Sequence, residues 1–512
     1  MLGLSPLAAA LAVTAAVLLR FVCLVVYRLY FSPLAAFPGP RLAAATYLVE
    51  MYHELLDGEG GQFPFVYRQW HEKYGPIVRI NPDELHIQDS AWHETMYSAS
   101  RPVRKPEKLA TRFGNPLSAF AATDHATHRL RRAALNPFFS RRKVAEHEGQ
   151  IQRTMDRMLA RLEREFAGAG RVVSLNKMWG SLTSDTIMAF AFERQTNLVD
   201  GPDFESPLNE AMADLLEPVH WVTLVPALGR LLQALPDALA VWLQPAMASV
   251  VRFNREMAAQ VAAVLAAKAR GDQQGGGGGG LFAALLESGL PAAELTATRL
   301  QHEAVSIVGA GVESTMRALT VGCFHVLDQP AVRAALVAEL RAAIPDASRM
   351  PGWDALAQLP YLAAVVNEAL RLSYGTSQRM PRAYPDGPLA FGAWTIPPGT
   401  LLSMDNYAVS HDEAVFPDSF RFDPARWLGD CRAADGRQLS RYLVSFGKGT
   451  RSCTGMQLAY AEMYIALASF FRSPLALRAR LFDTDRSDVE LARDRFAPRS
   501  RKASKGVRVV FD

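Results

Sequence analysis

The chain has 512 residues, of which 49% are hydrophobic and 21% charged, and its formal net charge is +4. These values are typical of a globular protein, exclude an intrinsically disordered chain, and give no indication of a nucleic-acid partner. The four cysteines (Cys23, Cys323, Cys431 and Cys453) are far apart, which excludes a disulfide framework and favours a reducing compartment. Length alone allows roughly two to four domains or one large enzyme domain.

The chain begins with an apolar segment, Leu7–Tyr27, in which Arg20 is the only charged residue. At 1.5 Å per helical residue this segment spans about 31 Å, roughly one hydrocarbon thickness, so residues 1–31 are predicted to form a transmembrane anchor. A cleaved secretory signal is the alternative, but such a signal starts with basic residues, and no charge precedes Arg20. Because Arg28 and Arg41 follow the segment, the positive-inside tendency places the body of the protein in the cytosol.

Prolines then prevent the helix from continuing. Residues 32–50 begin with Ser32-Pro33 and contain the sequence FPGP, which predicts a stiff, extended hinge. Further on, residues 74–87 contain two β-rich runs separated by Asn81-Pro82-Asp83-Glu84. This pattern predicts a β-hairpin.

Residues 51–512 are predicted to form one catalytic domain, most of it helical. The clearest helices are expected at His125–Leu135, Gln150–Phe166, Phe253–Arg270, Thr298–Leu327 and Ala355–Leu372. The run Gly271–Gly280, GDQQGGGGGG, predicts a flexible loop, and strands and loops are expected after Pro381. The predicted fold class is mostly α with small β-sheets.

One cysteine lies in a sequence that indicates chemistry. The segment FGKGTRSCTG places Cys453 before a long apolar helix, where a helix N-terminus is expected to lower the pKa of the thiol. Gly449 and Gly455 would let the backbone approach a flat cofactor, Phe446 would screen it, and Arg451 would pair with its acidic edge. A buried structural cysteine is the alternative, and is the commoner role of a lone cysteine.

This segment resembles the haem-binding loop of the cytochrome P-450 family, with all five signature positions present (Phe446, Gly449, Arg451, Cys453 and Gly455). Agreement at five positions by chance has a probability on the order of 10⁻⁴ or less. In that family the cysteine thiolate is an axial ligand of the haem iron. The resemblance therefore implies the family's fold, haem b with Cys453 as the metal ligand, O₂ as oxidant, and electrons from NADPH through a flavin reductase.

Upstream motifs of the family occur in the expected order. Glu368 and Arg371 match the E-x-x-R motif, and Arg426 in FDPARW resembles the arginine that completes a structural Glu-Arg-Arg network. The same E-x-x-R spacing at Glu490 and Arg493 is interpreted as a chance match or a surface pair.

The stretch Ala310–Thr315 resembles the family's oxygen-binding motif in a long helix. Its GAGVES sequence differs from a dinucleotide-binding loop because Ser314 replaces the third glycine and the stretch is mid-helix. The Ser314 hydroxyl is predicted to bond the carbonyl of Ala310, Gly311 to remove bulk over the haem, and Glu313 to relay protons. The family usually has threonine where this chain has Ser314, and Thr315 is the competing candidate for the hydroxyl role.

The segment DHATHRLRRAALNPFFS resembles the family's C helix, with His128 in place of the usual tryptophan. His128, Arg132 and Arg382 are predicted to reach haem propionates. His125 is predicted to be a surface residue. The neighbouring basic residues have two open interpretations, a solvated helix face or a docking patch for an acidic reductase (Arg129, Arg131, Arg141, Arg142 and Lys143).

The resemblance extends over residues 37–511 and is closest to fungal secondary-metabolism members of the trichodiene-oxygenase type. It implies a monooxygenase acting on a small hydrophobic terpenoid or polyketide, anchored in the endoplasmic reticulum by a single span. The alternatives are a haem-thiolate isomerase or dehydratase, and a non-catalytic haem-binding protein. The substrate pocket is expected to be lined by residues 104–123, 304–312, 376–381 and 496–498.

Overall fold

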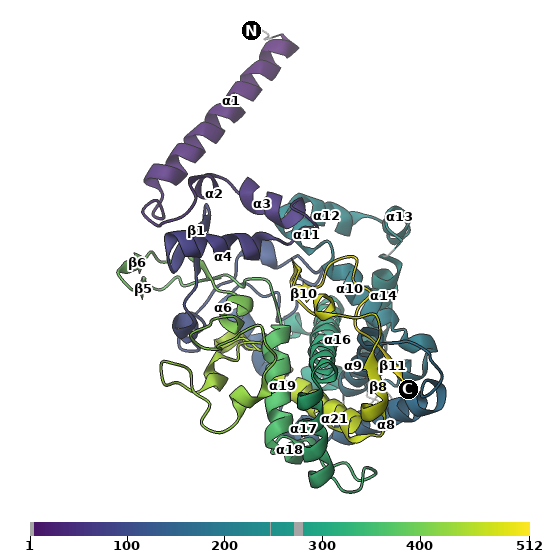
Figure 1. Ribbon diagram of the computed structural model, residues 1–512. Helices are drawn as coiled ribbons and strands as arrows, with labels where there is room; N and C mark the ends of the chain where they lie inside the picture. The colour runs from purple at the N-terminus through teal and green to yellow at the C-terminus, as the bar shows by residue number, and fades with distance from the viewer. Residues whose placement is uncertain (1–4, 246, 271–279) are drawn as a thin grey trace.

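The computed structural model describes residues 5–245, 247–270 and 280–512. The predicted Gly271–Gly280 loop lies outside the described residues except for Gly280. Helix α1 (Pro6–Val26) projects away from the body of the protein, and a short π-helix (Tyr27–Phe31) follows it (Figure 1). The most apolar 18-residue window of Pro6–Phe31 has a mean hydropathy of 2.5 and contains no buried residue, so the segment is long and apolar enough to cross a membrane.

The predicted hinge is helical in its second half. After the turns that end at Pro40, helix α2 (Arg41–Ala45) begins, and α3 (Leu48–Leu55) and α4 (Phe63–Tyr74) follow it. Pro40 precedes the first residue of α2, a position where its missing N–H costs the helix nothing. The prolines therefore end α1 and its extension but do not keep residues 41–50 extended.

The predicted hairpin is confirmed as β1 (Ile77–Asn81) and β2 (Glu84–Ile87), which pair antiparallel with Ile77 opposite Ile87. Strands β7 (Leu401–Ser403) and β4 (Arg382–Ala383) extend it to a four-stranded sheet of order β1-β2-β7-β4. The remaining small sheets are β5 (Leu389–Phe391) with β6 (Trp394–Ile396), β9 (Arg493–Arg495) with β10 (Ala497–Arg499), and β3 (Val173–Ser174), β11 (Arg508–Phe511) and β8 (Ala479–Leu481).

The rest of the body is helical, which confirms the predicted fold class. Its helices are α5 (His93–Met96), α6 (His125–Leu135), α7 (Arg141–Ala145), α8 (Glu148–Glu165), α9 (Leu175–Phe192), α10 (Pro207–Leu216), α11 (Val219–Leu224), α12 (Pro226–Ala234), α13 (Asp237–Leu243), α14 (Met247–Ala269), α15 (Leu281–Glu287), α16 (Ala297–Asp328), α17 (Pro330–Ala343), α18 (Trp353–Leu356), α19 (Pro360–Ser373), α20 (Asn406–Ser410), α21 (Met456–Arg472) and α22 (Leu475–Arg478).

Four of the five predicted helices are present, and one prediction is wrong. Helix α6 has the predicted bounds and α16 is one residue longer at each end, whereas α14 begins earlier than expected, at Met247. The helix predicted over Ala355–Leu372 is two helices, α18 and α19. The division occurs because Pro360 cannot donate a helical hydrogen bond and so starts a new helix.

Helix α16 is the central element of the body and packs against α9, α19, α14 and α21 (Figure 1). Nearly every residue of α9 is buried, as expected for a helix surrounded by others. Close approach of α16 to its neighbours requires small residues: a Cβ on Gly322 would lie 3.0 Å from the Cβ of Ala369 on α19. This core holds α16 firmly beside the cavity described next.

Candidate active site

A cavity of about 360 Å³ is lined both by α16 and by the loop that contains Cys453. Its wall is mostly apolar, and all four predicted pocket segments contribute to it. Sequence analysis missed the part of the wall formed by α9 and α10 (Ile187, Met212, Leu215 and Leu216). A hydrophobic helix face carries no signal that separates cavity lining from core, because both are apolar.

The Cys453 thiol is accessible from the cavity, although it is set deep in the body. The backbone N–H of Cys453 donates to the carbonyl of Phe446 at 2.8 Å, which closes the loop. We expected a lowered thiol pKa, and this was wrong: burial raises the pKa of Cys453 and outweighs the Gly455 N–H and the Arg132 charge, which lower it. Helix α21 begins only at Met456, so the sulfur lies before the first helical turn.

Two of the three glycines of the site, Gly449 and Gly311, have different tasks from those predicted. Gly449 has φ +70°, and a Cβ there would lie 2.1 Å from the carbonyl oxygen of Tyr97. Glycine is therefore needed at this position because the Tyr97 backbone packs against it. Gly455 lines the cavity and has open space around its Cα, as a flat cofactor would need. Gly311 also lines the cavity, but a Cβ on it would meet Ile187 at 2.9 Å, so its main effect is to let α16 approach α9.

Seven basic side chains line the same cavity, and no one of them forms an ion pair within the described residues: Lys105, His128, Arg132, Arg317, Arg382, Lys448 and Arg451. Burial and the neighbouring arginines lower the pKa of Lys105 well below its usual range. Burial and the charge of Arg451 lower the pKa of His128 to about 3, so this imidazole is neutral at neutral pH, and its Nδ1 has no partner. The positive charge of the set therefore lies mainly on its arginines, which have no protein counterions.

These side chains are held by main-chain carbonyls. Arg132 donates to the Ser452 carbonyl at 2.7 Å, which ties α6 to the Cys453 loop. Arg451 donates to the Ala122 carbonyl at 2.5 Å, and its Nε has no partner. Burial and the charge of Arg382 lower the pKa of Arg451 to about 9. Phe446 lines the cavity and packs against Tyr460, with ring centroids 5.1 Å apart.

On α16, the Ser314 hydroxyl donates to the carbonyl of Ala310 at 2.9 Å, the predicted hydrogen bond. Ala310 and Ser314 are both exposed to the cavity, whereas Thr315 is buried although it also borders the cavity. The hydroxyl that faces the open space is thus that of Ser314.

The Glu313 carboxylate forms an ion pair with Arg499 of β10. One oxygen of Glu313 and one nitrogen of Arg499 have no hydrogen-bond partner and are buried. Sequence analysis missed Arg499, because 186 residues separate it from Glu313 and no local pattern links them.

Glu368, Arg371 and Arg426 form one buried network. Glu368 Oε1 accepts from Arg371 at 2.7 Å and from Arg426 at 3.0 Å, and Glu368 Oε2 accepts from Trp427 Nε1 at 2.8 Å. Arg371 also donates to three carbonyls of the following loop, those of Ser410, Ser419 and Arg421. Burial raises the pKa of Glu368, but the hydrogen bonds and charges of Arg371 and Arg426 outweigh it and lower the pKa. Trp427 was not predicted as a member.

The sequence model of the cytochrome P-450 family matches residues 45–473. The chain belongs to the cytochrome P-450 family. It is 46% identical to cytochrome P-450 monooxygenase orf4 of Eupenicillium brefeldianum, over 99% of this chain and 98% of that protein. It is 40% identical to tryptophan 6-hydroxylase fscE of Fusarium equiseti and 36% identical to cytochrome P-450 monooxygenase sdnE of Sordaria araneosa, each over 95% of this chain and 94% of that protein.

The resemblance to fungal members is therefore confirmed, and this cytochrome P-450 is a monooxygenase. Family membership brings a haem with a thiolate iron ligand and the use of O₂. The residues present fit this group: a carboxylate-bearing macrocycle would supply the counterions that the basic set lacks, and Gly455 leaves it room. A metal ion bound by a thiol deprotonates it outright, so the raised pKa of free Cys453 is no obstacle.

Two predictions about basic residues of this cytochrome P-450 are corrected. Arg131 is buried and forms an ion pair with Glu294 at 2.7 Å, so it belongs neither to a solvated face nor to a docking patch. His125 is half-buried, and its Nδ1 accepts from the N–H of Val103 at 3.3 Å, which ties α6 to the preceding loop. Arg129 is exposed, as both interpretations of the basic residues require.

Proposed function

We propose that this monooxygenase inserts one oxygen atom into a C–H bond or alkene of a small hydrophobic terpenoid or polyketide in fungal secondary metabolism. The observation that supports this proposal is the mostly apolar cavity that reaches from Cys453 to the Ser314 hydroxyl. Concave apolar pockets with few polar groups bind hydrophobic ligands by excluding water. The few polar side chains on the wall are then available to bind the cofactor or to deliver protons.

When bound, the haem supplies the iron centre at which O₂ is activated. Cys453 would hold the iron, while Arg132, Arg382 and Arg451 would bind the acidic edge of the haem through charge-assisted hydrogen bonds. The Ser314 hydroxyl donates its proton to the Ala310 carbonyl, so its oxygen lone pairs are left to accept a hydrogen bond in the cavity. Glu313, positioned by Arg499, relays protons towards the cavity.

The electrons are proposed to come from NADPH through a flavin reductase. Arg129 and Arg142 are exposed basic residues of the C-helix region and are candidates for contact with an acidic partner. Arg142 also contacts Glu146 at 2.9 Å, so Arg129 is the less neutralised of the two.

The purified full-length protein, reduced under CO, is expected to show the red-shifted Soret band of a thiolate ligand. With reductase and NADPH, product formation is expected to require O₂; product without O₂ would identify an isomerase or dehydratase. A histidine-type CO spectrum would contradict the role of Cys453, and haem binding without NADPH consumption would indicate a non-catalytic haem protein. Metabolite analysis of a strain lacking the gene would identify the substrate.

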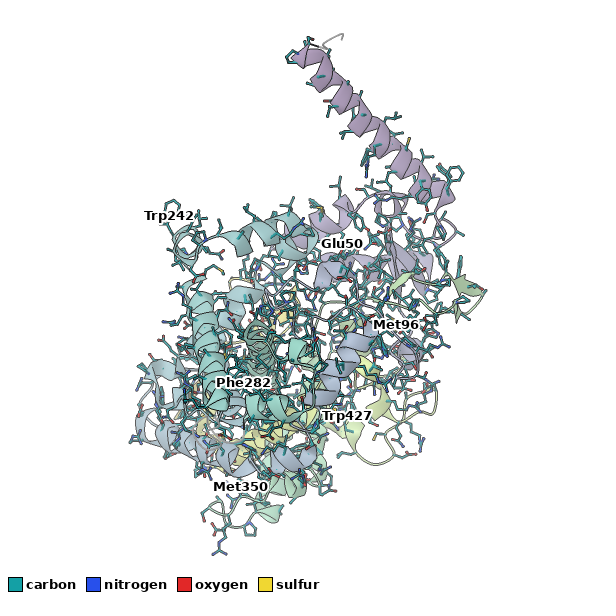
Figure 2. All side chains as sticks on the ribbon, turned by 180° about the vertical axis from the view of Figure 1, so that it is seen from behind. Glu50, Met96, Trp242, Phe282, Met350 and Trp427 are labelled. Atoms are coloured by element: carbon teal, nitrogen blue, oxygen red, sulfur yellow. The ribbon has the colours of Figure 1, made fainter. Side chains whose placement is uncertain are left out.

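We also propose a single-pass anchor over residues 1–31 in the endoplasmic reticulum, a hinge at 32–50 and a cytosolic catalytic domain at 51–512. Helix α1 supports the anchor, and apolar side chains on α3, α12 and α13 extend the membrane-facing surface. Figure 2 shows Trp242 of α13 at the outer edge of the molecule, on the side from which α1 projects. The most exposed of these side chains are Leu48, Tyr52, Leu56, Leu231, Trp242 and Leu243.

Deleting residues 1–26 tests this arrangement better than deleting 1–31. Arg28 donates to the Ala45 carbonyl at 2.9 Å, and its own carbonyl accepts from Arg79 at 2.8 Å, so the end of the predicted anchor is fixed to the body. The truncated protein is expected to leave the membrane with CO binding intact. If it still pellets with membranes after a high-salt wash, and Trp242→Ser releases it, the apolar face on α13 is a second attachment site.

A further inference from the structure

Arg112 is a buried arginine behind the wall of the substrate cavity. It is 3% exposed and lies in the loop between the first sheet and α6. Its Nη1 donates to the side-chain oxygen of Gln378 at 2.5 Å, and its Nη2 lies 3.8 Å from the sulfur of Met380. Its Nε has no hydrogen-bond partner, and within the described residues it forms no ion pair.

Aromatic rings surround the remaining faces of this guanidinium. Its central carbon lies 4.5 Å from the ring centroid of Phe496, 4.7 Å from that of Phe113 and 5.6 Å from that of Phe120. These three rings, together with Gln378 and Met380, all line the cavity that contains Cys453. Arg112 therefore lies directly behind the cavity wall. The hydrogen bond to Gln378, the contact with Met380 and the three aromatic contacts are all with residues that line the cavity.

Other buried arginines of this protein have carboxylate partners or donate to main-chain carbonyls. Arg79 donates to the Pro82 carbonyl at 2.8 Å, and Arg317 donates to the Val489 carbonyl at 2.8 Å. Arg379 forms ion pairs with Glu50 and Glu84, at 2.5 and 2.8 Å, and Arg371 pairs with Glu368 at 2.7 Å. Contacts with aromatic faces offset only part of the desolvation of a buried cation. Burial lowers the pKa of Arg112 to about 9, with the charge of Asp494 opposing this effect, so the side chain stays charged at neutral pH.

We propose that Arg112, together with Gln378, recognises a carboxylate on the substrate. Because Gln378 accepts the Arg112 hydrogen bond through its oxygen, its amide NH₂ is left as a second donor beside the guanidinium. Two adjacent donors, one of them charged, match the two oxygens of a carboxylate. The substrate is then an apolar acid whose acidic group lies at Arg112. This inference rests on the proposed function and adds the substrate class to it.

The test compares carboxylic acids with their own methyl esters, which differ in charge but hardly in shape. Dodecanoic acid, 3-(indol-3-yl)propionic acid and their methyl esters would be titrated against the haem-loaded full-length protein carrying 4-phenylimidazole. Displacement of the azole, read from the Soret band, reports binding even where no spin shift occurs. At least one acid is expected to bind about tenfold or more tightly than its ester.

Arg112→Met is expected to abolish this preference while leaving ester affinity and the CO spectrum unchanged. Arg112→Lys should keep part of it, because the charge remains, and Gln378→Leu should reduce it several-fold. Arg101→Met, a change of an exposed arginine in the same loop, is the matched control and should have no effect.

Three outcomes would overturn the proposal. The first is that no acid binds better than its ester, and the second is that the preference survives in Arg112→Met. The third is that Arg112→Met loses haem, which would place Arg112 with the side chains that hold the cofactor's acidic edge. Absence of a thiolate-type CO spectrum in the unaltered protein would instead reject the proposed function itself, so the two failures are distinguishable.

Discussion

The Glu368 network and the wall of the cavity differ in how many of their buried polar atoms have hydrogen-bond partners. In the Glu368 network every buried side-chain nitrogen and oxygen has a hydrogen-bond partner. Around the cavity several buried atoms have none, on residues His128, Glu313, Arg451 and Glu462. Both regions are equally enclosed by the body, so burial alone does not explain the difference.

This difference distinguishes the structural Glu368 network from the functional cavity. An unsatisfied buried polar atom costs about 1–3 kcal/mol. The Glu368 network is complete within the chain and holds the loop that leads to Cys453. At the cavity, a cofactor or a substrate would supply partners that the chain itself does not provide.

Breaking the complete network should have the largest effect. Glu368→Gln leaves Arg371 buried without a counterion, which is expected to cost about 3–5 kcal/mol and to release the haem. The measurement is the haem content per protein and the thermal midpoint. Glu490→Gln is the matched control, since Glu490 also precedes an arginine by three residues but forms an exposed pair with Arg486 at 2.7 Å. Equal haem loss in both variants would contradict the comparison.

Changing the cavity hydroxyl should impair chemistry while leaving the scaffold intact. Ser314→Ala is expected to keep its haem but to lower the yield of product per NADPH by about tenfold or more, with peroxide formed instead. Ser314→Thr should match or improve the yield, because a branched side chain holds its hydroxyl in fewer rotamers. Thr315→Ala, which removes a buried hydroxyl, should have a smaller effect. The reverse order would transfer the role to Thr315.

Removing the cation beside Glu313 should impair coupling. In Arg499→Met the Glu313 carboxylate loses its ion-pair partner and is no longer held in place at the cavity. The yield of product per NADPH is expected to fall several-fold while haem content stays unchanged. Arg501→Met, a change of an exposed arginine nearby, serves as control. An unchanged yield in Arg499→Met would show that the Glu313–Arg499 pair takes no part in proton delivery.

The smallest expected effect concerns Glu462 on α21. Burial raises the pKa of this carboxyl well above its usual range, and no ion pair within the described residues opposes it. The folded state therefore keeps a proton that the unfolded state releases, so stability falls as pH rises from the usual glutamate range towards the raised value. Glu462→Gln, which has no ionisable side chain at this position, should remove this fall in stability with rising pH.

The advantage of Glu462→Gln in thermal midpoint should be absent near pH 4.5 and grow towards pH 7, to the equivalent of roughly 1 kcal/mol. Glu490→Gln, whose carboxylate is exposed, should show no such trend. A constant difference across this pH range would mean that Glu462 ionises in the folded protein.

Sequence analysis recovered the parts of the fold that depend on local signals. Asp124 caps α6 through a hydrogen bond to the Thr127 N–H, which is why the predicted bounds of this helix hold. The hairpin at β1 and β2 follows from a turn sequence of the same local kind. The division at Pro360 was readable in principle, because a proline inside a predicted helix is itself a signal for a boundary.

The site was recovered only where its residues belong to motifs. Cys453 and Ser314 were found this way, whereas Arg499, Trp427 and Arg112 act through contacts with residues far away in the sequence. Gly449 illustrates the limit for a motif residue: its position was readable, but its close contact with the Tyr97 backbone depends on tertiary structure. The thiol pKa of Cys453 was mispredicted because burial, which a sequence does not give, outweighs the local N–H groups.

Asp494 of β9 connects α11 with the cavity wall. Its carbonyl accepts from His220 of α11 at 2.8 Å, and its side chain accepts from the N–H of Phe496 at 2.9 Å and from Ser377 at 2.6 Å. Helix α11 leads directly into α12 of the exposed apolar face, and Phe496 and its neighbour Ala497 line the cavity. In the proposed membrane arrangement, a displacement of α11 by lipid would reach Phe496 through the hydrogen bonds of Asp494. Substrate affinities measured in detergent and in a bilayer are therefore expected to differ, even for a substrate that never dissolves in the lipid.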